Sequence, residues 1–479
     1  MNRALLLLFL LLVGCGGGEP VPERPPNILL VTIDTLRADH LSAYGYKRNT
    51  SPNIDQLAAE GVLFEHPIAQ WPKTGPSFAS LLSATYPKDN NIIRRVGRPV
   101  PSSMRLLAEE LRDLGYQTHA VVSNGALASE LRYNQGFDTY DEVWKLGGDL
   151  ERNNHGAIVN ERAQLAIDKI ANNDAPYFFW VHYIDPHFPY TPPGEFRDRF
   201  QNDEHFDPNS REIKVREDRK RSQMYAIGTD MVLDNRRDLA FYVARYDAEI
   251  AYVDHQFGLF LNVMKDRGLM NDTVTVLTSD HGESLGEHEY YFSHGRFGYQ
   301  ATLRVPLIVH APNRFAPRVD SAPAELIHLT PTFLELAGLP LENGRWMQGR
   351  SLLSRLKGEG GGRWQFGFAE AGYAMDRNWQ RIVRGERFKL IYAADWKDQR
   401  QITGERYQPL ALFDLEKDPQ ETVNVMSEHP EELERLQRAL GSWWEAPPFN
   451  VERDTATGDD DGEMSDVTRR QLEALGYLQ

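Results

Sequence analysis

Short apolar runs that alternate with helical patterns restrict the fold of this chain more than any other feature. Each run is too short for a core helix and is apolar on both faces, which is typical of strands in a parallel sheet covered by helices. Segments with apolar residues at helical spacing separate the runs. The sequence therefore predicts an α/β fold with a large, mostly parallel sheet flanked by helices. The predicted strands are residues 27–33, 62–68, 119–122, 177–183, 273–278 and 304–309. The predicted helices begin after Ser51 and at Pro76, or cover residues 104–113, 161–171, 238–265 and 325–337.

The pattern changes after residue 340. A hairpin at 380–392, a strand at 410–415 and a helix at 430–443 predict a small C-terminal α+β lobe. Residues 198–237 are charged and irregular, so we expect an inserted surface loop there. The expected units are a signal peptide at 1–15, a flexible tether at 16–26, a catalytic domain at 27–340, the lobe at 341–450, and a mobile acidic segment and tail at 451–479.

The first fifteen residues have the pattern of a targeting segment. Asn2 and Arg3 precede an apolar run over residues 4–13, which is too short to span a membrane. The run ends in Gly14 and Cys15, and small residues before a cysteine resemble the bacterial lipobox, in which the cysteine is lipid-modified. An ordinary signal peptide with an incidental Cys15 is the alternative. We expect an exported protein that is lipid-anchored to a bacterial membrane, on the periplasmic or cell-surface face, and that contacts the membrane through this anchor only.

Two counts exclude other classes of protein. Cys15 is the only cysteine, so one chain forms no internal disulfide and has no thiol for catalysis or for a cysteine-rich metal site. The net charge is −16, and no basic domain is visible that would neutralise phosphates, which argues against a nucleic-acid partner.

Three metal-competent side chains follow two of the predicted strands. Asp34 comes directly after the first strand, and Asp280 and His281 follow the strand at 273–278. Ligands of open α/β sheets bind at the carboxyl ends of the strands, so these side chains point to one metal site. Carboxylate and imidazole ligands favour zinc or manganese, and calcium is possible.

A turn rich in hydroxyl groups supplies a candidate nucleophile. Thr74 lies two residues before a helix that starts at Pro76, and Lys73 precedes it with a positive charge. A helix N-terminus favours an anionic group, and a hydroxyl on a metal ion can attack phosphorus or sulfur. We therefore expect Thr74 to be both the nucleophile and a metal ligand. The alternative is that Thr74 only caps the helix.

Several other polar residues end strands of the same sheet. His182 and His187 lie at the end of the strand at 177–183, Asn124 follows the strand at 119–122, and His294 follows His281 in the chain. We expect His187 and His294 to hold ester oxygens or to protonate the leaving alcohol, together with Lys73. His182 and Asn124 are predicted to assist in substrate binding.

These motifs, in this order, resemble the sulfatase family of the alkaline-phosphatase superfamily. The run from Asn27 to Asp34 resembles its opening strand and first metal carboxylate, and Thr74-x-Pro76-Ser77 falls on its Cys-x-Pro-Ser-Arg nucleophile motif. Asp280-His281-Gly282-Glu283 resembles its second metal motif, and Arg304 opens its following strand. The resemblance runs from about residue 27 to 340 and implies a metal-dependent ester hydrolase.

The chain departs from the family pattern at four positions. Sulfatases convert the motif cysteine, or in some a serine, to formylglycine, and Thr74 does not undergo that conversion. Phe78 replaces the motif arginine, Thr35 replaces the second aspartate of the first strand, and Ser123-Asn124 replaces a Gly-Lys pattern.

The resulting functional prediction is a metal-dependent hydrolase of phosphate or sulfate esters that uses a metal-bound Thr74. The expected substrate is a small anionic ester or a glycan or lipid headgroup. The threonine also resembles that of phosphoethanolamine and phosphoglycerol transferases, which usually carry several membrane helices that this sequence lacks. The third possibility is a non-catalytic, surface-anchored binding protein.

Overall fold

The computed structural model of the chain describes residues 24–90, 92, 99–146, 155–217, 223–341, 347–360, 364–372, 379–394, 408–446 and 464–475. The predicted signal peptide with Cys15, most of the predicted tether, and the acidic run 451–463 lie outside these residues. None of the helices within the described ranges has both the length and the hydrophobicity that crossing a membrane requires.

An eight-stranded sheet forms the centre of the molecule, in the order β13-β2-β12-β9-β1-β6-β4-β5. Each neighbouring pair is parallel except for the two pairs that involve β12, which runs antiparallel to both β9 and β2. The strands are β1 (Asn27–Ile33), β2 (Val62–Phe64), β4 (Gln117–Val122), β5 (Thr139–Glu142), β6 (Tyr177–Tyr183), β9 (Thr273–Thr278), β12 (Leu307–His310) and β13 (Arg318–Asp320). The predicted α/β class with a mostly parallel sheet is confirmed.

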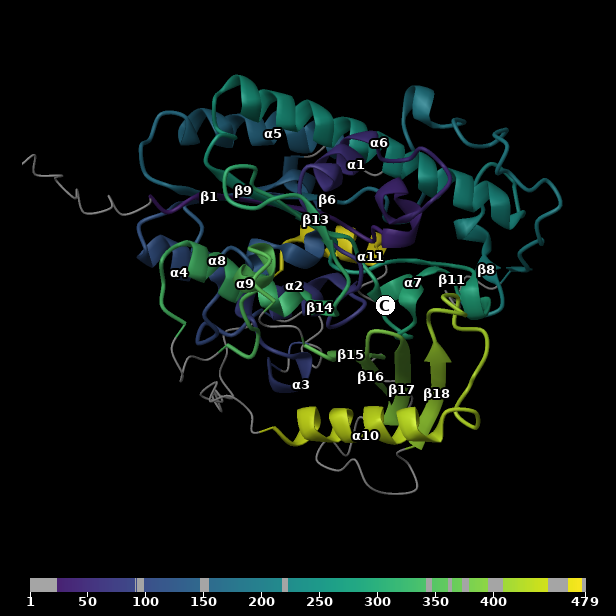
Figure 1. The fold of residues 1–479 in the computed structure, drawn as a ribbon. Coiled ribbons are helices and arrows are strands. Elements are labelled where there is room, and N and C mark those ends of the chain that lie inside the picture. The colour runs from purple at the N-terminus through teal and green to yellow at the C-terminus, as the bar shows by residue number, and fades with distance from the viewer. Residues whose placement is uncertain are drawn as a thin grey trace, which may run out of the picture.

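Helices cover both faces of this sheet, as Figure 1 shows. Alternate residues of β1 enter different cores: Ile28 and Leu30 pack with α2, α4 and α8, whereas Leu29 and Val31 pack with α1, α5 and α6. Burial on both faces explains why the strands read as continuous apolar runs. The helices are α1 (Pro52–Ala59), α2 (Thr74–Ser83), α3 (Pro87–Asn90), α4 (Leu107–Asp113), α5 (His155–Ile170), α6 (Leu239–Asp266), α7 (Gln300–Leu303), α8 (Leu329–Leu336) and α9 (Leu353–Leu356).

A smaller lobe follows, as expected from the change of pattern after residue 340. Its four antiparallel strands have the order β15-β16-β17-β18, and α10 packs on β16 and β17 (Figure 1). The elements are β15 (Gly367–Ala371), β16 (Trp379–Arg384), β17 (Phe388–Ala394), β18 (Gln408–Asp414) and α10 (Pro430–Glu445). Short strand pairs complete the fold: β3 (Pro67–Ile68) with β14 (Ala324–Glu325), β7 (Val215–Arg216) with β8 (Ile227–Gly228), and β10 (Ser284–Leu285) with β11 (Tyr291–Ser293).

Several predicted boundaries were wrong. The strand expected at 62–68 divides into β2 of the large sheet and β3 of a separate pair. Glu325, expected in a helix, lies in β14, and the helix α8 begins at Leu329. Within the expected tail, residues 466–474 form helix α11 (Asp466–Ala474), which packs on the turns after β4 and β5.

A buried carboxyl group joins the lobe to the large domain. Glu325 accepts hydrogen bonds from the Tyr86 hydroxyl (3.0 Å) and from the main-chain N–H of Phe368 in β15 (2.9 Å). Burial raises the pKa of Glu325 to about 8, although these hydrogen bonds oppose the shift. At neutral pH the folded protein therefore keeps this group protonated, whereas an unfolded chain ionises it.

The Glu325→Gln variant should lose less stability than the wild type as the pH rises from about 4 to about 8. In this window the folded state binds the Glu325 proton and the unfolded state releases it, so ionisation favours unfolding as the pH rises. Glutamine keeps the shape and cannot ionise. The measurement is the thermal midpoint of both proteins across this pH range. Parallel pH profiles for the two proteins would contradict the prediction.

Candidate metal centre and active site

The candidate site lies where the carboxyl ends of β9, β1, β6 and β4 meet. These four strands are consecutive neighbours in the sheet and all parallel, so the residues that follow them converge. Asp34 follows β1, Asp280 and His281 follow β9, His182 lies near the end of β6, and Asn124 follows β4.

Asp34, Asp280 and His281 form a buried group whose ligand atoms all lie within 4.8 Å of one another. The Nε2 atom of His281 is 3.3 Å from Asp280 Oδ2 and 4.0 Å from Asp34 Oδ1. The ring Nδ1–H of His281 donates to the carbonyl of Gly282 (2.9 Å), so Nε2 carries the lone pair and faces the carboxylates. This tautomer is the one that binds a metal ion.

Each carboxylate has one oxygen held by donors and one bare oxygen. Asp280 Oδ1 accepts from the main-chain N–H groups of His281 (3.0 Å) and Thr35 (3.3 Å), and Asp34 Oδ2 accepts from Asn124 Nδ2 (2.5 Å). Asp280 Oδ2 and Asp34 Oδ1 are buried and have no hydrogen-bond partner among the described residues. Two bare carboxylate oxygens and an imidazole lone pair at one point fit a divalent cation, because buried polar atoms otherwise need partners.

The pKa shifts of Asp34, Asp280 and His281 also indicate a site for a cation. Burial and the charge of Asp34 raise the pKa of Asp280 to about 7. Burial would raise the pKa of Asp34 too, but its contact with His182 and the charges of the neighbouring histidines hold it below its usual range. Burial lowers the pKa of His281 to about 4, which keeps its ring neutral. Two buried carboxylates beside a neutral imidazole leave an excess of negative charge.

Thr74 lies beside the same atoms. Helix α2 begins at Thr74 itself and not at Pro76 as predicted, and Lys73 occupies the cap position without a side-chain capping bond. The Thr74 hydroxyl is buried, 3.2 Å from His281 Nε2. The Ser77 hydroxyl donates to the carbonyl of Asp280 (2.7 Å), which ties the first turn of α2 to the metal-site loop. Thr74 therefore does not cap the helix; it stands at the positive end of the helix dipole.

Two predicted histidines lie above this group. The ring centroid of His294 is 4.2 Å from that of His281 and 5.2 Å from that of His187. His294 Nδ1 is 3.2 Å from Glu283 Oε1, a fully buried carboxyl group that fixes the ring. Burial and the charge of His187 lower the pKa of His294, and Lys73 adds to this effect. Burial lowers the pKa of Lys73 itself to about 8.

His182 and Asn124 contact the Asp34 carboxylate. His182 Nε2 is 3.5 Å from Asp34 Oδ2, and its Nδ1 contacts the Thr32 hydroxyl (2.9 Å). Asn124 Oδ1 accepts from the N–H of Ala126 (2.9 Å), so its amide group is oriented from both sides. These contacts favour a role in orienting a metal ligand, and substrate binding by either residue stays a prediction.

Replacement of Asn124 with alanine should weaken divalent-metal binding by about 10- to 100-fold, the usual effect of losing a residue that orients a metal ligand. The reason is that Asp34 Oδ2 loses its shortest hydrogen bond. Titration of the metal-free protein with zinc or manganese measures the change. Asn90→Ala is the matched control, because Asn90 is also buried and its hydrogen bonds go to Thr85, Ser80 and the main-chain N–H of Ile92, none of which holds a candidate metal ligand. Equal metal affinity of the Asn124 variant and the wild type would contradict the prediction.

Sequence reasoning gave no role to three residues that build the site. Glu283 was visible as part of the second metal motif, but its contact with His294 was not. Arg37 pairs with Asp39 and Glu287 (2.7 Å each) and donates to the carbonyl of Glu283 (3.0 Å).

Thr35 has a φ of 56°, a costly conformation for a β-branched residue, and this aims its N–H at Asp280. No sequence pattern signals such a conformation.

Comparison with known proteins gives consistent matches. Residues 26–339 match the family model described as sulfatase, and residues 286–443 match the one described as N-sulphoglucosamine sulphohydrolase, C-terminal. The chain is 26% identical to an arylsulfatase of Clostridium perfringens (87% of this chain, 93% of that protein) and 27% identical to a choline-sulfatase of Rhizobium meliloti (85% and 83%).

Solved structures share the fold. A protein solved in complex with its substrate D-glucosamine-2-N,6-O-disulfate superposes with a TM-score of 0.69 at 21% identity, covering 89% of this chain and 100% of that one. The phosphonate monoester hydrolase of Agrobacterium radiobacter superposes with a TM-score of 0.68 at 22% identity, covering 88% and 96%. At these identities the structures establish the architecture.

Proposed function

We propose, from the premise that this chain belongs to the sulfatase family and is an ester hydrolase, that it cleaves sulfate or phosphate esters with Thr74 as its nucleophile. The proposed substrates are small anionic esters or anionic glycan or lipid headgroups. Relatives named arylsulfatase and choline-sulfatase support the sulfate class, and the structural neighbour named phosphonate monoester hydrolase supports the phosphorus class.

The convergence of three bare ligand atoms on the Thr74 hydroxyl carries the proposal. Thr74 Oγ1 lies within hydrogen-bond distance of His281 Nε2, which itself faces the bare oxygens of Asp34 and Asp280. We infer that Asp34, Asp280, His281 and Thr74 hold one divalent cation, zinc or manganese by the chemistry of the donors. When bound, such a cation would stabilise negative charge on the oxygens that it contacts.

The chain's own residues account for the remaining steps. The Thr74 oxygen forms a bond to the sulfur or phosphorus of the ester, its proton passes to water, and the bond to the alcohol oxygen breaks. The departing alcohol oxygen takes a proton from His187, and the neutral ring of His294, which lies against it, holds an ester oxygen. Water then attacks the sulfo- or phospho-threonine and gives a proton back to the histidine. The bond to the Thr74 oxygen breaks, sulfate or phosphate leaves, and the Thr74 oxygen regains its proton from water. Lys73 offsets the charge of the ester oxygens.

The threonine sets this chain apart from formylglycine sulfatases. Phe78, at the position of the motif arginine, is fully buried and packs against the rings of Trp180 (5.0 Å) and His182 (5.2 Å). An apolar ring in this position supplies no charge to a modified nucleophile. Direct attack by the unmodified Thr74 is the chemistry that these side chains support.

Two measurements test the function together. The metal-loaded enzyme is assayed on aryl sulfate, phosphate monoester, phosphate diester and phosphonate monoester substrates, and the acid-quenched enzyme is analysed by peptide mass spectrometry. We expect turnover of at least one class, and a sulfo or phospho group on the peptide that contains Thr74. Turnover with the adduct on another peptide would show that Thr74 is not the nucleophile. Transfer of the sulfo or phospho group to an added alcohol in place of water would favour the transferase alternative.

A further inference from the structure

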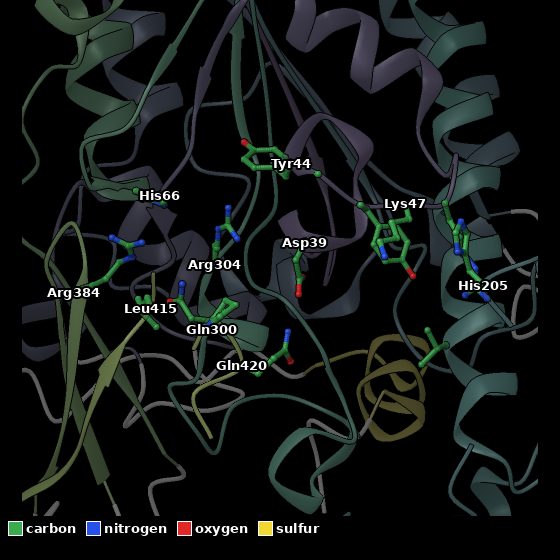
Figure 2. Close-up of a pocket in the computed structure, with 15 residues that line it drawn as sticks. Asp39, Tyr44, Lys47, His66, His205, Gln300, Arg304, Arg384, Leu415 and Gln420 are labelled. Carbon is green, nitrogen blue, oxygen red and sulfur yellow. The ribbon is translucent and has the colours of Figure 1, made fainter. Parts of the chain in front are cut away.

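A cavity of about 650 Å³ lies between the large domain and the lobe, apart from the metal centre. Its walls come from the loop after β1, from the segment around α7, and from the lobe, as Figure 2 shows. None of the candidate metal ligands or catalytic residues lines it. The residues that matter for its chemistry are Asp39, Lys47, Arg48, His66, Arg304 and Arg384.

Basic groups dominate this cavity, and three of them lack an acidic partner. Lys47, Arg304 and Arg384 form no ion pair with any carboxylate among the described residues. The other charges at the walls are already matched: Arg48 pairs with Asp203 (2.8 Å) and Asp247 (2.9 Å), and Asp39 pairs with Arg37. The cavity wall therefore presents basic groups that form no ion pair in the described part of the chain.

Arg384 is the most unusual of these groups. Its side chain is 2% exposed, its NH1 donates only to the carbonyls of Gly385 and Glu386, and its Nε has no hydrogen-bond partner in the described part of the chain. Burial and the charge of Arg304 lower the pKa of Arg384 to about 9. A buried guanidinium that lacks an anionic partner is costly and therefore uncommon.

Neighbouring groups show the same imbalance. The buried Nδ1 of His66 has no hydrogen-bond partner among the described residues, and burial with the charges of Arg384 and Arg304 lowers the pKa of His66 to about 3. Arg304 donates through its Nε and NH2 to the carbonyl of Glu65 (3.3 and 3.1 Å), so its NH1 is the group that an anion could engage. The nearby carboxylate of Glu421 offsets part of the positive charge of Arg384, but it already forms an ion pair with Lys389 (2.6 Å).

We propose that this cavity is a second anion-binding site, in which Arg384 and Arg304 hold one oxyanion: a sulfate, phosphate or carboxylate group. Guanidinium and ammonium donors form strong, charge-assisted hydrogen bonds with such groups, and an anion would relieve the repulsion between Arg304 and Arg384. The oxyanion is either a second anionic group of the substrate or a free inorganic ion. The site stands independently of the proposed hydrolysis, because it uses none of the catalytic residues.

Two loops connect this cavity with the metal centre. The segment after Asp34 continues to Asp39 and Lys47, and the segment after His294 continues to Gln300 and Arg304. The same two stretches of chain thus contribute residues to both sites.

Thermal unfolding with low-millimolar sodium sulfate or phosphate, against sodium chloride of equal ionic strength, tests the site. Because a ligand that binds the folded state raises the midpoint, we expect the wild type to gain stability from the oxyanions specifically. Arg304→Gln and Arg384→Gln should reduce this gain, with apparent affinity lower by about tenfold for the loss of one charge-assisted hydrogen bond. Lys265→Gln, an exposed lysine at the end of α6, is the matched control and should keep the full response.

The catalytic centre also attracts oxyanions, but it is unchanged in these variants, so the difference from the wild type reports the cavity alone. An undiminished response in Arg304→Gln and in Arg384→Gln would overturn the proposal. Should the fully buried Arg384 not tolerate glutamine, the partly exposed Arg304 decides alone. Inactivity of the enzyme on every ester leaves this readout intact, so failure of the proposed function is recognised separately.

Kinetics then identify the source of the oxyanion. The variants are assayed on an aryl ester that carries one anionic group and on a related ester that carries a second one. A several-fold rise in KM for the second ester alone assigns the site to the substrate. Unchanged KM for both esters, together with the lost stabilisation, assigns it to a free inorganic ion. A rise in KM for both esters in equal measure would show that the variants disturb the catalytic centre, and the site would be rejected.

Discussion

Alanine in place of Thr74 should lower turnover on the best ester substrate by on the order of 10⁴- to 10⁶-fold, the range seen when a nucleophile is removed. The hydroxyl is the only group of this side chain that can form the covalent intermediate, and it lies 3.2 Å from the lone pair of His281. The fold should remain, because alanine suits the first turn of a helix and α2 receives no side-chain capping bond from Lys73. Initial rates and the circular dichroism of the purified variant provide the measurement.

Thr74→Ser is the control for this experiment. Serine keeps a hydroxyl at the same position, so this variant should retain activity well above that of the alanine variant. Near-normal turnover by Thr74→Ala would show that another group attacks the ester, and the mechanism would be wrong.

Exchange of Asp280 for asparagine should abolish activity and the response to divalent metal, while the metal-free protein becomes more stable. Two buried carboxylates whose bare oxygens face one site repel each other, and asparagine removes one charge while its Oδ1 keeps the hydrogen bonds from Thr35 and His281. Its new amide group can also donate toward Asp34. Thermal midpoints with chelator and with excess zinc or manganese measure both effects.

Asp254→Asn is the matched control for the metal experiment. Asp254 is also a buried carboxylate, but it accepts hydrogen bonds from the N–H groups of Asn53 and Ile54 at the start of α1. This variant should keep the full metal response whatever its stability. A wild-type protein whose midpoint does not change with any divalent ion would contradict the metal centre itself.

The central strands were predictable because their burial imposes a simple pattern. β1, β6 and β9 have the predicted bounds to the residue, since both faces of each strand are covered and apolar or β-branched residues fill most positions. Boundaries failed where tertiary contacts override local preference. The sequence pattern predicts one strand at 62–68, but the chain changes sheets at Glu65 and His66, between Phe64 and Pro67, and no local pattern shows which strand each half will pair with.

The candidate metal ligands could be predicted from the sequence, but the residues that hold those ligands in place could not. Asp34, Asp280 and His281 were expected together because parallel strands bring their carboxyl ends to one edge, and the structure places them within 4.8 Å. The supporting contacts depend on distances between residues far apart in the chain. Glu283 beneath His294 and the strained Thr35 are examples, because their roles follow from side-chain packing and a backbone angle.

Helix α11 has a consequence for the timing of biosynthesis. Gln471 of this helix donates to the carbonyl of Ser123 (3.3 Å), and Leu472 packs on Ala126, on either side of the Asn124 that holds Asp34. A ribosome releases β1 and β4 long before it reaches α11. All three candidate metal ligands are thus synthesised before the helix that secures the Asn124 turn, because α11 follows both the large domain and the lobe in the chain.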